Sequence, residues 1–310
     1  MNKKKFMLTF DVEQNFPPYG NGYEGVKKAL PKIIDILDEM DVHSTMFVTG
    51  RTAELYPKII KRASKNHEIQ CHTYNHEVLD ELKKKDQMNS IRKCKEILEL
   101  TTGKKIYGFR APYLRFNEDT MEVLHELGFR YDSSILVKGM IGKSWYAVKK
   151  INRNILDLIF NPDEKITDFY VSMTKFLKST KKLENMTKTE RARFFYYIMN
   201  PFQSISKNTE DKIKSLGMQE VKINLRSIYM RLPIFNASML KSDIVVSYLH
   251  PWEFIELEKY INIKGILIFD WLFSGEKLLN ALRSRIKDIM ENGYKFVTIS
   301  EYLGLDEKQI

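Results

Sequence analysis

Strand and helix signals alternate along the first 135 residues, and this alternation limits the fold more than any other feature of the chain. Residues 6–10 have the composition of a buried strand, and residues 31–40 have the apolar spacing of an amphipathic helix with proline in its first turn. A second strand is expected at 44–48, followed by a helix near 53–64. Strands that alternate with helices in this way form right-handed βαβ units. The sequence therefore predicts an α/β fold with a parallel sheet.

The same alternation continues to residue 135 and resumes after about residue 218. A helix is expected around 91–100, and a second one should begin at Asn117, with an acidic first turn, and end at Gly128. The remaining predicted elements are strands at 105–109, 131–134, 221–223, 244–250 and 295–298, and a helix at 275–291. A chain of 310 residues has room for one large barrel or for two smaller domains. We interpret residues 1–310 as a single domain that contains an insertion.

The predicted insertion, residues 138–208, is basic and rich in aromatic residues. It contains 14 Lys and Arg, 6 Asp and Glu and eleven aromatic residues, and so holds most of the net charge of +10. Its spacing is helical. One interpretation is a helical cap that packs its aromatic rings on the barrel; the other is a surface for anionic membrane or lipid-linked phosphate. Nucleic acid is not expected as a partner, because no recognised binding motif accompanies the charge.

Three features bear on where the protein is expected to act. Its two cysteines cannot form a disulfide framework, which fits a reducing compartment. The first residues, MNKKKFMLTFDVE, lack the apolar stretch of a signal peptide, and no apolar run approaches the ~18 residues of a membrane-spanning helix. We therefore expect a cytoplasmic protein, with peripheral contact at the inner face of the membrane as a further hypothesis.

Polar residues that suit a hydrolytic site follow several of the predicted strands. Asp11 and Glu13 are two apart at a strand end, so both carboxylates should face one pocket. His72 and His76 are four apart and would share one face of a helical turn, a common way to present two imidazoles to one metal. Arg110 follows another strand and could pair with a carboxylate. Taken singly, each motif is more typical of a solvated turn or a structural histidine than of a site.

Two further segments, YDSS at 131–134 and SYLHPWE at 247–253, complete a set of five. In chain order the segments read D-x-E, HTxxH, RAPY, YDSS and LHPWE. This set resembles the polysaccharide deacetylase family (NodB homology, carbohydrate esterase family 4), and in particular the branch whose first motif reads FDVE. The resemblance covers about residues 6–135 and 219–303. It implies a distorted (β/α)7-8 barrel with its site at the carboxyl ends of the strands, and we expect a mostly helical insertion within it.

The resemblance also implies a catalytic role for each matching residue. Asp11 would be the general base, held ionised by Arg110, and His250 would be the general acid. A divalent metal, most simply Zn²⁺ with Co²⁺, Ni²⁺ or Fe²⁺ as alternatives, would be bound by two imidazoles and a carboxylate. The implied metal ligands are Glu13, His72 and His76.

A substrate groove is implied by the same comparison. Tyr113 would contribute a backbone N–H to the oxyanion site, while Pro112 and Trp252 would form walls for the sugar. Asp132 is assigned to this region too. It would either orient the general acid or cap its own turn. The sequence departs from the commoner family pattern at two points: Glu13 stands where Asp is usual, and the fourth motif lacks its tryptophan.

The function implied is metal-dependent removal of an N-acyl group, most simply N-acetyl, from an amino sugar of a glycan or of a lipid- or nucleotide-linked precursor. One alternative is hydrolysis of a small cyclic amide or ureide, as in allantoinase-like relatives. Another is a catalytically silent, carbohydrate-binding relative. The presence of both Asp11 and His250 favours turnover, and the intact set of metal ligands favours metal-dependent chemistry.

Overall fold

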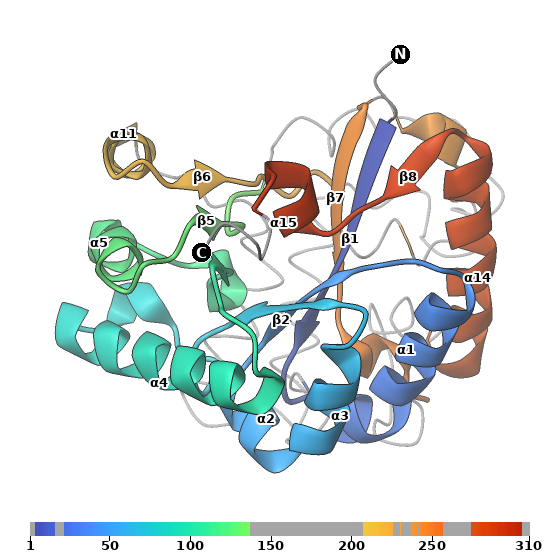
Figure 1. Ribbon diagram of the computed structural model, residues 1–310, viewed down its shortest axis with the longest axis horizontal. Helices are drawn as coiled ribbons and strands as arrows, with labels where there is room; N and C mark the ends of the chain where they lie inside the picture. Colours follow the sequence, from blue (N-terminus) through green and yellow to red (C-terminus); the bar gives the residue numbers. More distant parts are fainter. Residues whose placement is uncertain are drawn as a thin grey trace, which may run out of the picture.

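The computed structural model describes residues 4–15, 22–136, 207–225, 230, 237–240, 242–256 and 274–305. In this part of the chain, eight strands form one sheet in which every strand pair is parallel (Figure 1). The strands are β1 (Lys4–Val12), β2 (Thr45–Val48), β3 (Glu68–Cys71), β4 (Gly108–Phe109), β5 (Tyr131–Asp132), β6 (Gln219–Glu220), β7 (Ile244–Leu249) and β8 (Tyr294–Phe296). Their order is β6-β5-β4-β3-β2-β1-β7, with β8 paired to β1.

The two ends of the sheet meet just beyond β6. Leu225 forms a bridge with Ser247 of β7, and the backbone N–H groups of Asn224 and Leu225 donate to the carbonyl of Val246 at 3.1 and 3.0 Å. These contacts close the sheet into a barrel. The α/β barrel expected from the sequence is therefore confirmed, while the helical insertion expected at 138–208 lies outside the described residues except for its last two.

The barrel is distorted because β1 shares one of its edges between two neighbours. Its first residues, Lys4–Phe6, pair with β8, whereas Thr9–Val12 pair with β2. The opposite edge of β1 pairs with β7 from Lys5 to Phe10. A regular barrel strand has one neighbour on each side, whereas β1 pairs with β7 on one side and with both β2 and β8 on the other.

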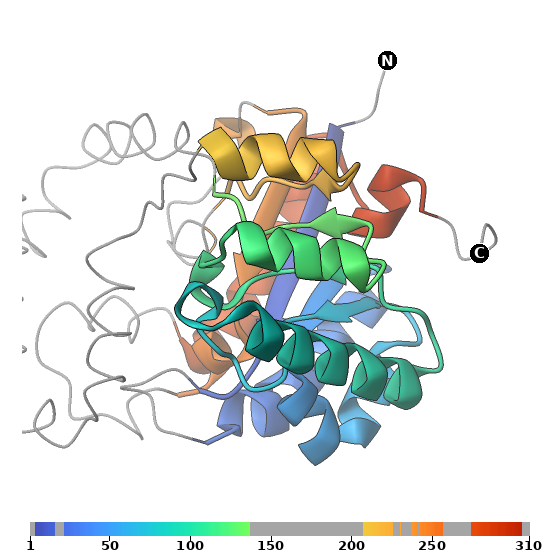
Figure 2. The same ribbon diagram turned by 90° about the vertical axis from the view of Figure 1, so that its left-hand side faces the viewer.

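Helices surround the sheet, as Figure 1 shows, and α4, α5 and α11 lie in a row on one side (Figure 2). The helices are α1 (Leu30–Glu39), α2 (Gly50–Leu55), α3 (Pro57–Ala63), α4 (Lys84–Thr102), α5 (Glu118–Glu126), α11 (Lys207–Ser215), α14 (Gly275–Glu291) and α15 (Ile299–Leu303). The single helix expected near 53–64 is wrong, because the chain breaks at Tyr56 (φ −130°, ψ 49°) between α2 and α3. Pro57 disfavours a helical conformation at the residue before it.

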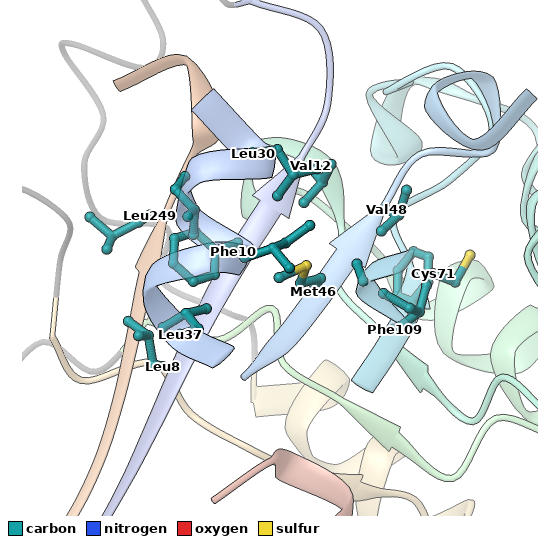
Figure 3. Close-up of a cluster of buried hydrophobic side chains, with 14 of the residues drawn as sticks. Leu8, Phe10, Val12, Leu30, Leu37, Met46, Val48, Cys71, Phe109 and Leu249 are labelled. Carbon is teal, nitrogen blue, oxygen red and sulfur yellow. The ribbon is translucent and has the colours of Figure 1, made fainter. Parts of the chain in front are cut away.

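Alternation along β1 separates the outside of the barrel from the inside. Phe6, Leu8, Phe10 and Val12 are buried and belong to the cluster beneath the helices, where Leu30 and Leu37 of α1 pack near them (Figure 3). Met7 belongs instead to a second cluster with Phe47, Tyr131 and Val246. Since side chains alternate between the two faces of a strand, Thr9 and Asp11 share the inner face with Met7. The inner face of β1 is thus apolar at its start and polar at its end.

A polar network lies at the amino-terminal end of the barrel. The Glu68 carboxylate accepts hydrogen bonds from Thr45 Oγ1 at 2.6 Å, from the Tyr131 hydroxyl at 2.9 Å and from the backbone N–H of Ile299 at 3.0 Å. These bonds join β2, β3, β5 and the first turn of α15. The opposite, carboxyl-terminal end is where the strand-end motifs lie. Among the described residues, no helix combines the length and apolar character needed to span a membrane.

Candidate active site

Five strands carry the predicted motifs to one edge of the sheet. Phe10 of β1 pairs with Leu249 of β7, Cys71 of β3 pairs with Phe109 of β4, and Phe109 pairs in turn with Asp132 of β5. In a parallel sheet the residues that follow these positions emerge at the same end. Six of the ten predicted site residues are joined there by close contacts between ionisable groups: Asp11, Glu13, His72, His76, Arg110 and His250.

Glu13 lies between the two histidines of the second motif. Its Oε2 atom is 3.3 Å from Nε2 of His72 and in closer contact with Nε2 of His76. One potential ligand atom from each of the three residues lies within 4.8 Å of the others, and all three side chains are buried. Glutamate, one methylene longer than the aspartate of the commoner motif, therefore reaches both imidazoles.

The two histidines come together through a loop, so the helical turn expected from their spacing is wrong. Residues 72–78 contain no helix, and both Thr73 and His76 have positive φ, 60° and 57°. A positive φ is unfavourable for residues other than glycine, and such conformations are concentrated at functional sites. The loop is stabilised by hydrogen bonds from the N–H groups of Gly50 and Arg51 to the carbonyls of Thr73 and Tyr74.

The orientation of His72 leaves a nitrogen lone pair facing Glu13. Its Nδ1 atom is 2.7 Å from the backbone carbonyl of Arg110. A carbonyl oxygen only accepts hydrogen bonds, so Nδ1 bears the proton and Nε2 of the neutral ring has a lone pair. Oε2 of Glu13 is buried without a hydrogen bond. A lone pair opposite a carboxylate oxygen is repulsive unless a cation lies between them, so this donor set fits a metal ion.

Ionisation of the set also suits metal binding. Burial lowers the pKa of His76 below its ordinary value, although the Glu13 carboxylate acts in the opposite direction. Burial by itself would raise the pKa of Glu13, but the neighbouring His76 and His72 outweigh it and lower that pKa well below 4.5. A neutral imidazole at His76 beside an ionised carboxylate at Glu13 is the combination of protonation states that metal binding requires.

Asp11 is held by Arg110. Nη1 of the arginine donates to Oδ1 of Asp11 at 2.7 Å and to the Thr9 hydroxyl at 2.8 Å. The remaining guanidinium nitrogens bond to the carbonyl and hydroxyl oxygens of Ser133, and the group stacks 4.1 Å from the Phe47 ring centroid. Arg110 is fully buried, so these partners replace its hydration. Of the two Asp11 carboxylate oxygens, Oδ1 is thus the one that Arg110 binds, and Oδ2 is the second.

His250 approaches that second oxygen from β7. Its Nε2 atom lies 3.9 Å from Oδ2 of Asp11, and its ring stacks on Trp252 at 4.7 Å between centroids and 23° between planes. Burial lowers the pKa of His250, but the Glu253 carboxylate outweighs this effect, helped by Glu13 and Asp11, and raises the pKa to about 9. The ring is thereby disposed to hold a proton beside Asp11.

The four residues predicted for the substrate groove each contact different groups. Tyr113 makes an edge contact with the His76 ring at 4.5 Å, and its own φ is 56°. Trp252 is buried, and its Nε1 lies 3.4 Å from Oε1 of Glu13. Pro112 is buried at the start of the turn η3 (Pro112–Leu114). Asp132 accepts hydrogen bonds from the N–H and hydroxyl of Ser134, at 2.9 and 2.7 Å.

One residue near the centre of the site was not singled out from the sequence. Glu253 is fully buried, and its Oε1 atom lies 3.5 Å from Nδ1 of His250. It is the last residue of the LHPWE segment, three positions after the histidine. The sequence signal that could have identified Glu253 is this spacing from His250. Pro251, between them, begins the short turn η5 (Pro251–Phe254).

Comparison with known proteins identifies the amino-terminal part of the chain. The family model for polysaccharide deacetylase matches residues 1–131. A peptidoglycan deacetylase-like protein of Gibberella zeae is 32% identical over 120 residues, which is 38% of this chain and 36% of that protein. The peptidoglycan-N-acetylglucosamine deacetylase of Bacillus cereus is 33% identical over 129 residues, or 41% of this chain and 43% of the relative. The matched part is thus less than half the length of these relatives.

Solved structures show the same fold. A CE4 family pseudoenzyme from Bacillus anthracis matches 99% of this chain and 66% of its own, with a TM-score of 0.51 and 16% identity. A mutant of a CE4 family pseudoenzyme with restored enzymatic activity also has a TM-score of 0.51, with 69% of its chain covered. These structural matches support the barrel fold, but at an identity this low they carry no information on the reaction. Over residues 1–131, the chain is similar to the polysaccharide deacetylase family.

Proposed function

We propose that this protein is a metal-dependent hydrolase that removes an N-acyl group from an amino sugar. The main support is the convergence of Glu13, His72 and His76 within 4.8 Å of one another. A carboxylate fixed by a buried arginine and a histidine whose pKa is raised lie beside this set. Hydrolysis of an amide needs these three elements: an activated water, a base and an acid.

The metal ligands and their supports follow from the chain's own contacts. Glu13, His72 and His76 would hold a divalent ion, and the Arg110 carbonyl would keep His72 in the tautomer that binds it. Such an ion supplies Lewis acidity, which acidifies a water molecule and polarises an amide carbonyl. Two imidazoles and one carboxylate suit Zn²⁺ best, with Co²⁺, Ni²⁺ and Fe²⁺ as alternatives.

Asp11 and His250 would perform the two proton transfers. Oδ1 of Asp11 is occupied by Arg110, which leaves Oδ2 to accept the proton of the attacking water. Nε2 of His250, 3.9 Å from that oxygen, would donate a proton to the departing amine. The C–N bond of the amide then breaks as the amine leaves in protonated form, and the acyl group leaves as a carboxylic acid. Each of these groups is buried, which strengthens the electrostatic interactions between them.

The proposed substrate class rests on the relatives as well as on the site. Those of Bacillus cereus and Helicobacter pylori are named for deacetylation of peptidoglycan or of its N-acetylglucosamine. We extend only the common element, an N-acylated amino sugar, to this chain. A lipid- or nucleotide-linked precursor as substrate, and contact of residues 138–208 with anionic membrane or lipid-linked phosphate, stay predictions; most of that segment lies outside the described residues.

The decisive experiment supplies the zinc-loaded protein with N-acetyl and N-formyl amino sugars, both free and lipid-linked, and measures the acid released. We expect one of the two acids, acetate or formate, together with a new amine. Release should stop when the metal is removed with a chelator and return when Zn²⁺ is restored. Binding of a sugar without release of acid would instead support a silent carbohydrate-binding relative.

Two control measurements separate the remaining alternatives. Hydrolysis of a cyclic ureide in preference to every amino sugar would favour the allantoinase-like reaction. Turnover of a soluble chito-oligosaccharide, with no activity on lipid-linked sugars and no binding to anionic vesicles, would contradict the predicted membrane-side substrate while leaving the deacylation itself intact.

A further inference from the structure

We propose that Glu253 is the positioning residue of His250, in the place that the sequence offered to Asp132. This inference rests on the proposed function, because it concerns the histidine that would protonate the leaving amine. Glu253 is a buried carboxylate outside the proposed set of metal ligands.

The two ring nitrogens of His250 face different carboxylates. Nε2 is directed to Asp11, 3.9 Å from its Oδ2, and Nδ1 is directed to Glu253, 3.5 Å from its Oε1. Nδ1 is buried and forms no hydrogen bond to any described residue. A shift of a few tenths of an ångström would make the Nδ1–Oε1 contact a hydrogen bond, and catalytic hydrogen bonds are often long before substrate binds. Such a bond would direct Nε2 toward the reacting groups.

Backbone N–H groups join His250 and Glu253 by one hydrogen bond in each direction. The N–H of His250 donates to the other Glu253 carboxylate oxygen at 3.1 Å, and the N–H of Glu253 donates to the carbonyl of His250 at 3.0 Å. Trp252, between them, stacks on the imidazole. The carboxylate is fully buried and so cannot turn toward solvent. One of its oxygens faces the ring of His250 and the other accepts from the backbone N–H of the same residue.

Asp132 is committed to other partners. Its two carboxylate oxygens accept the hydroxyl and the N–H of Ser134 at 2.7 and 2.9 Å, and its neighbour across the strand pair β5–β6 is Glu220. Asp132 thus caps the turn that follows its own strand. The charged groups that act on His250 are Glu253, Glu13 and Asp11, with Glu253 foremost.

The test uses the full chain loaded with Zn²⁺, and Glu253→Gln as an isosteric change that removes only the charge and one acceptor. Two substrates are compared: the N-acyl amino sugar that the wild-type protein hydrolyses fastest, and 4-nitrophenyl acetate, whose phenolate leaves without a proton. Glu253→Gln should lower kcat for the amide by about 10- to 100-fold, part of the ~10²–10⁴ that a general acid supplies. KM, zinc content and turnover of the aryl ester should change less than twofold.

Histidine NMR provides a readout that needs no turnover. In wild-type protein labelled with ¹⁵N-histidine, His250 should show a proton on Nδ1 in a hydrogen bond, and this signal should shift in Glu253→Gln. The exposed Glu291→Gln serves as a matched control and should leave both the kinetics and the signal unchanged. A missing Nδ1 proton in wild-type protein overturns the proposal even if the variant does not fold.

The other outcomes are equally distinct. Equal losses on amide and ester with zinc retained, or the same set of changes in Asp132→Asn and not in Glu253→Gln, would overturn the role of Glu253. A wild-type protein that hydrolyses no N-acyl sugar, yet has the hydrogen-bonded Nδ1 proton, would refute the proposed function and leave the contact between Glu253 and His250 standing.

Discussion

Arg110 joins the two halves of the site through different parts of the same residue. Its backbone carbonyl accepts from Nδ1 of His72 and so sets the tautomer of a proposed metal ligand. Its guanidinium binds Asp11 and Thr9 and is fully buried. A lysine could not reproduce this geometry, because a guanidinium directs several donors in fixed directions and an ammonium does not. The proposed metal ligand His72 and the proposed base Asp11 are thus positioned by one residue at the end of β4.

At the same scale, Asp11→Asn should separate catalysis from metal binding. The asparagine keeps an oxygen for Nη1 of Arg110, and Asp11 is not among the metal ligands, so one equivalent of Zn²⁺ should still bind. Loss of the base should lower kcat by at least about 100-fold. Because Arg110 loses its counter-charge, the free energy of unfolding should also fall by roughly 3 kcal/mol. Zinc analysis, steady-state kinetics and urea unfolding measure these effects; wild-type turnover in the variant would refute the assigned base.

At the scale of elements, the turn η5 (Pro251–Phe254) depends on close packing against η1 (Gly25–Ala29). A Cβ atom on Gly25 would lie 2.5 Å from the backbone nitrogen of Trp252 and 2.6 Å from its Cα. The obstacle is backbone, which cannot rotate away as a side chain could. Since Trp252 contacts Glu13 and Glu253 faces His250, a displacement of η5 would affect both the metal ligands and the acid.

Gly25→Ala should therefore impair activity as well as stability. We expect a loss of about 1–3 kcal/mol in unfolding free energy, typical of overpacking, and at least a tenfold loss in kcat for the amide substrate. The matched control is Gly103→Ala at the end of α4, where a methyl group meets no atom within 4 Å but φ is +71°. That variant should lose about 1–2 kcal/mol of stability from backbone strain and keep its kcat. Similar kinetics in the two variants would show that η5 is not held by Gly25.

At the scale of the whole molecule, His67 makes stability depend on pH at a distance from the site. It lies just before β3, at the end of the strand opposite to His72, and neither of its ring nitrogens has a hydrogen bond to a residue that the structure describes. Burial lowers its pKa from 6.5 to about 4, although the Asp38 carboxylate opposes this shift. In the unfolded chain the pKa is the ordinary one. Between pH 6.5 and 4 the unfolded chain therefore binds a proton that the folded protein does not.

The free energy of unfolding should consequently decrease as pH falls through this range, by up to about 3 kcal/mol from His67. The variant His67→Leu removes the titrating group, so its stability should fall less between pH 7.5 and pH 4.5. Urea unfolding of both proteins at the two pH values measures the difference, and other titrating groups cancel in the comparison. Equal decreases in the two proteins would exclude His67 as the cause.

The sequence by itself determined the α/β class and most strand positions. These depend on local rules: side chains alternate along a strand, apolar residues recur with the helical period, and parallel strands end at one edge. The helix at 275–291 and the cap at Asn117 are confirmed for the same reason. The FDVE-type branch and the roles of the individual site residues stay proposals.

Only the tertiary structure decided how distant segments meet. Closure of the barrel joins Leu225 to Ser247, and the ion pair of Arg110 with Asp11 spans 99 positions. The loop that brings His76 back to Glu13 uses positive φ angles that local preference opposes, so spacing alone predicted a helix there. The approach of Glu253 to His250 depends on the turn after Pro251 and on side-chain rotamers. These features depend on packing and register across the whole barrel, which no local pattern in the sequence encodes.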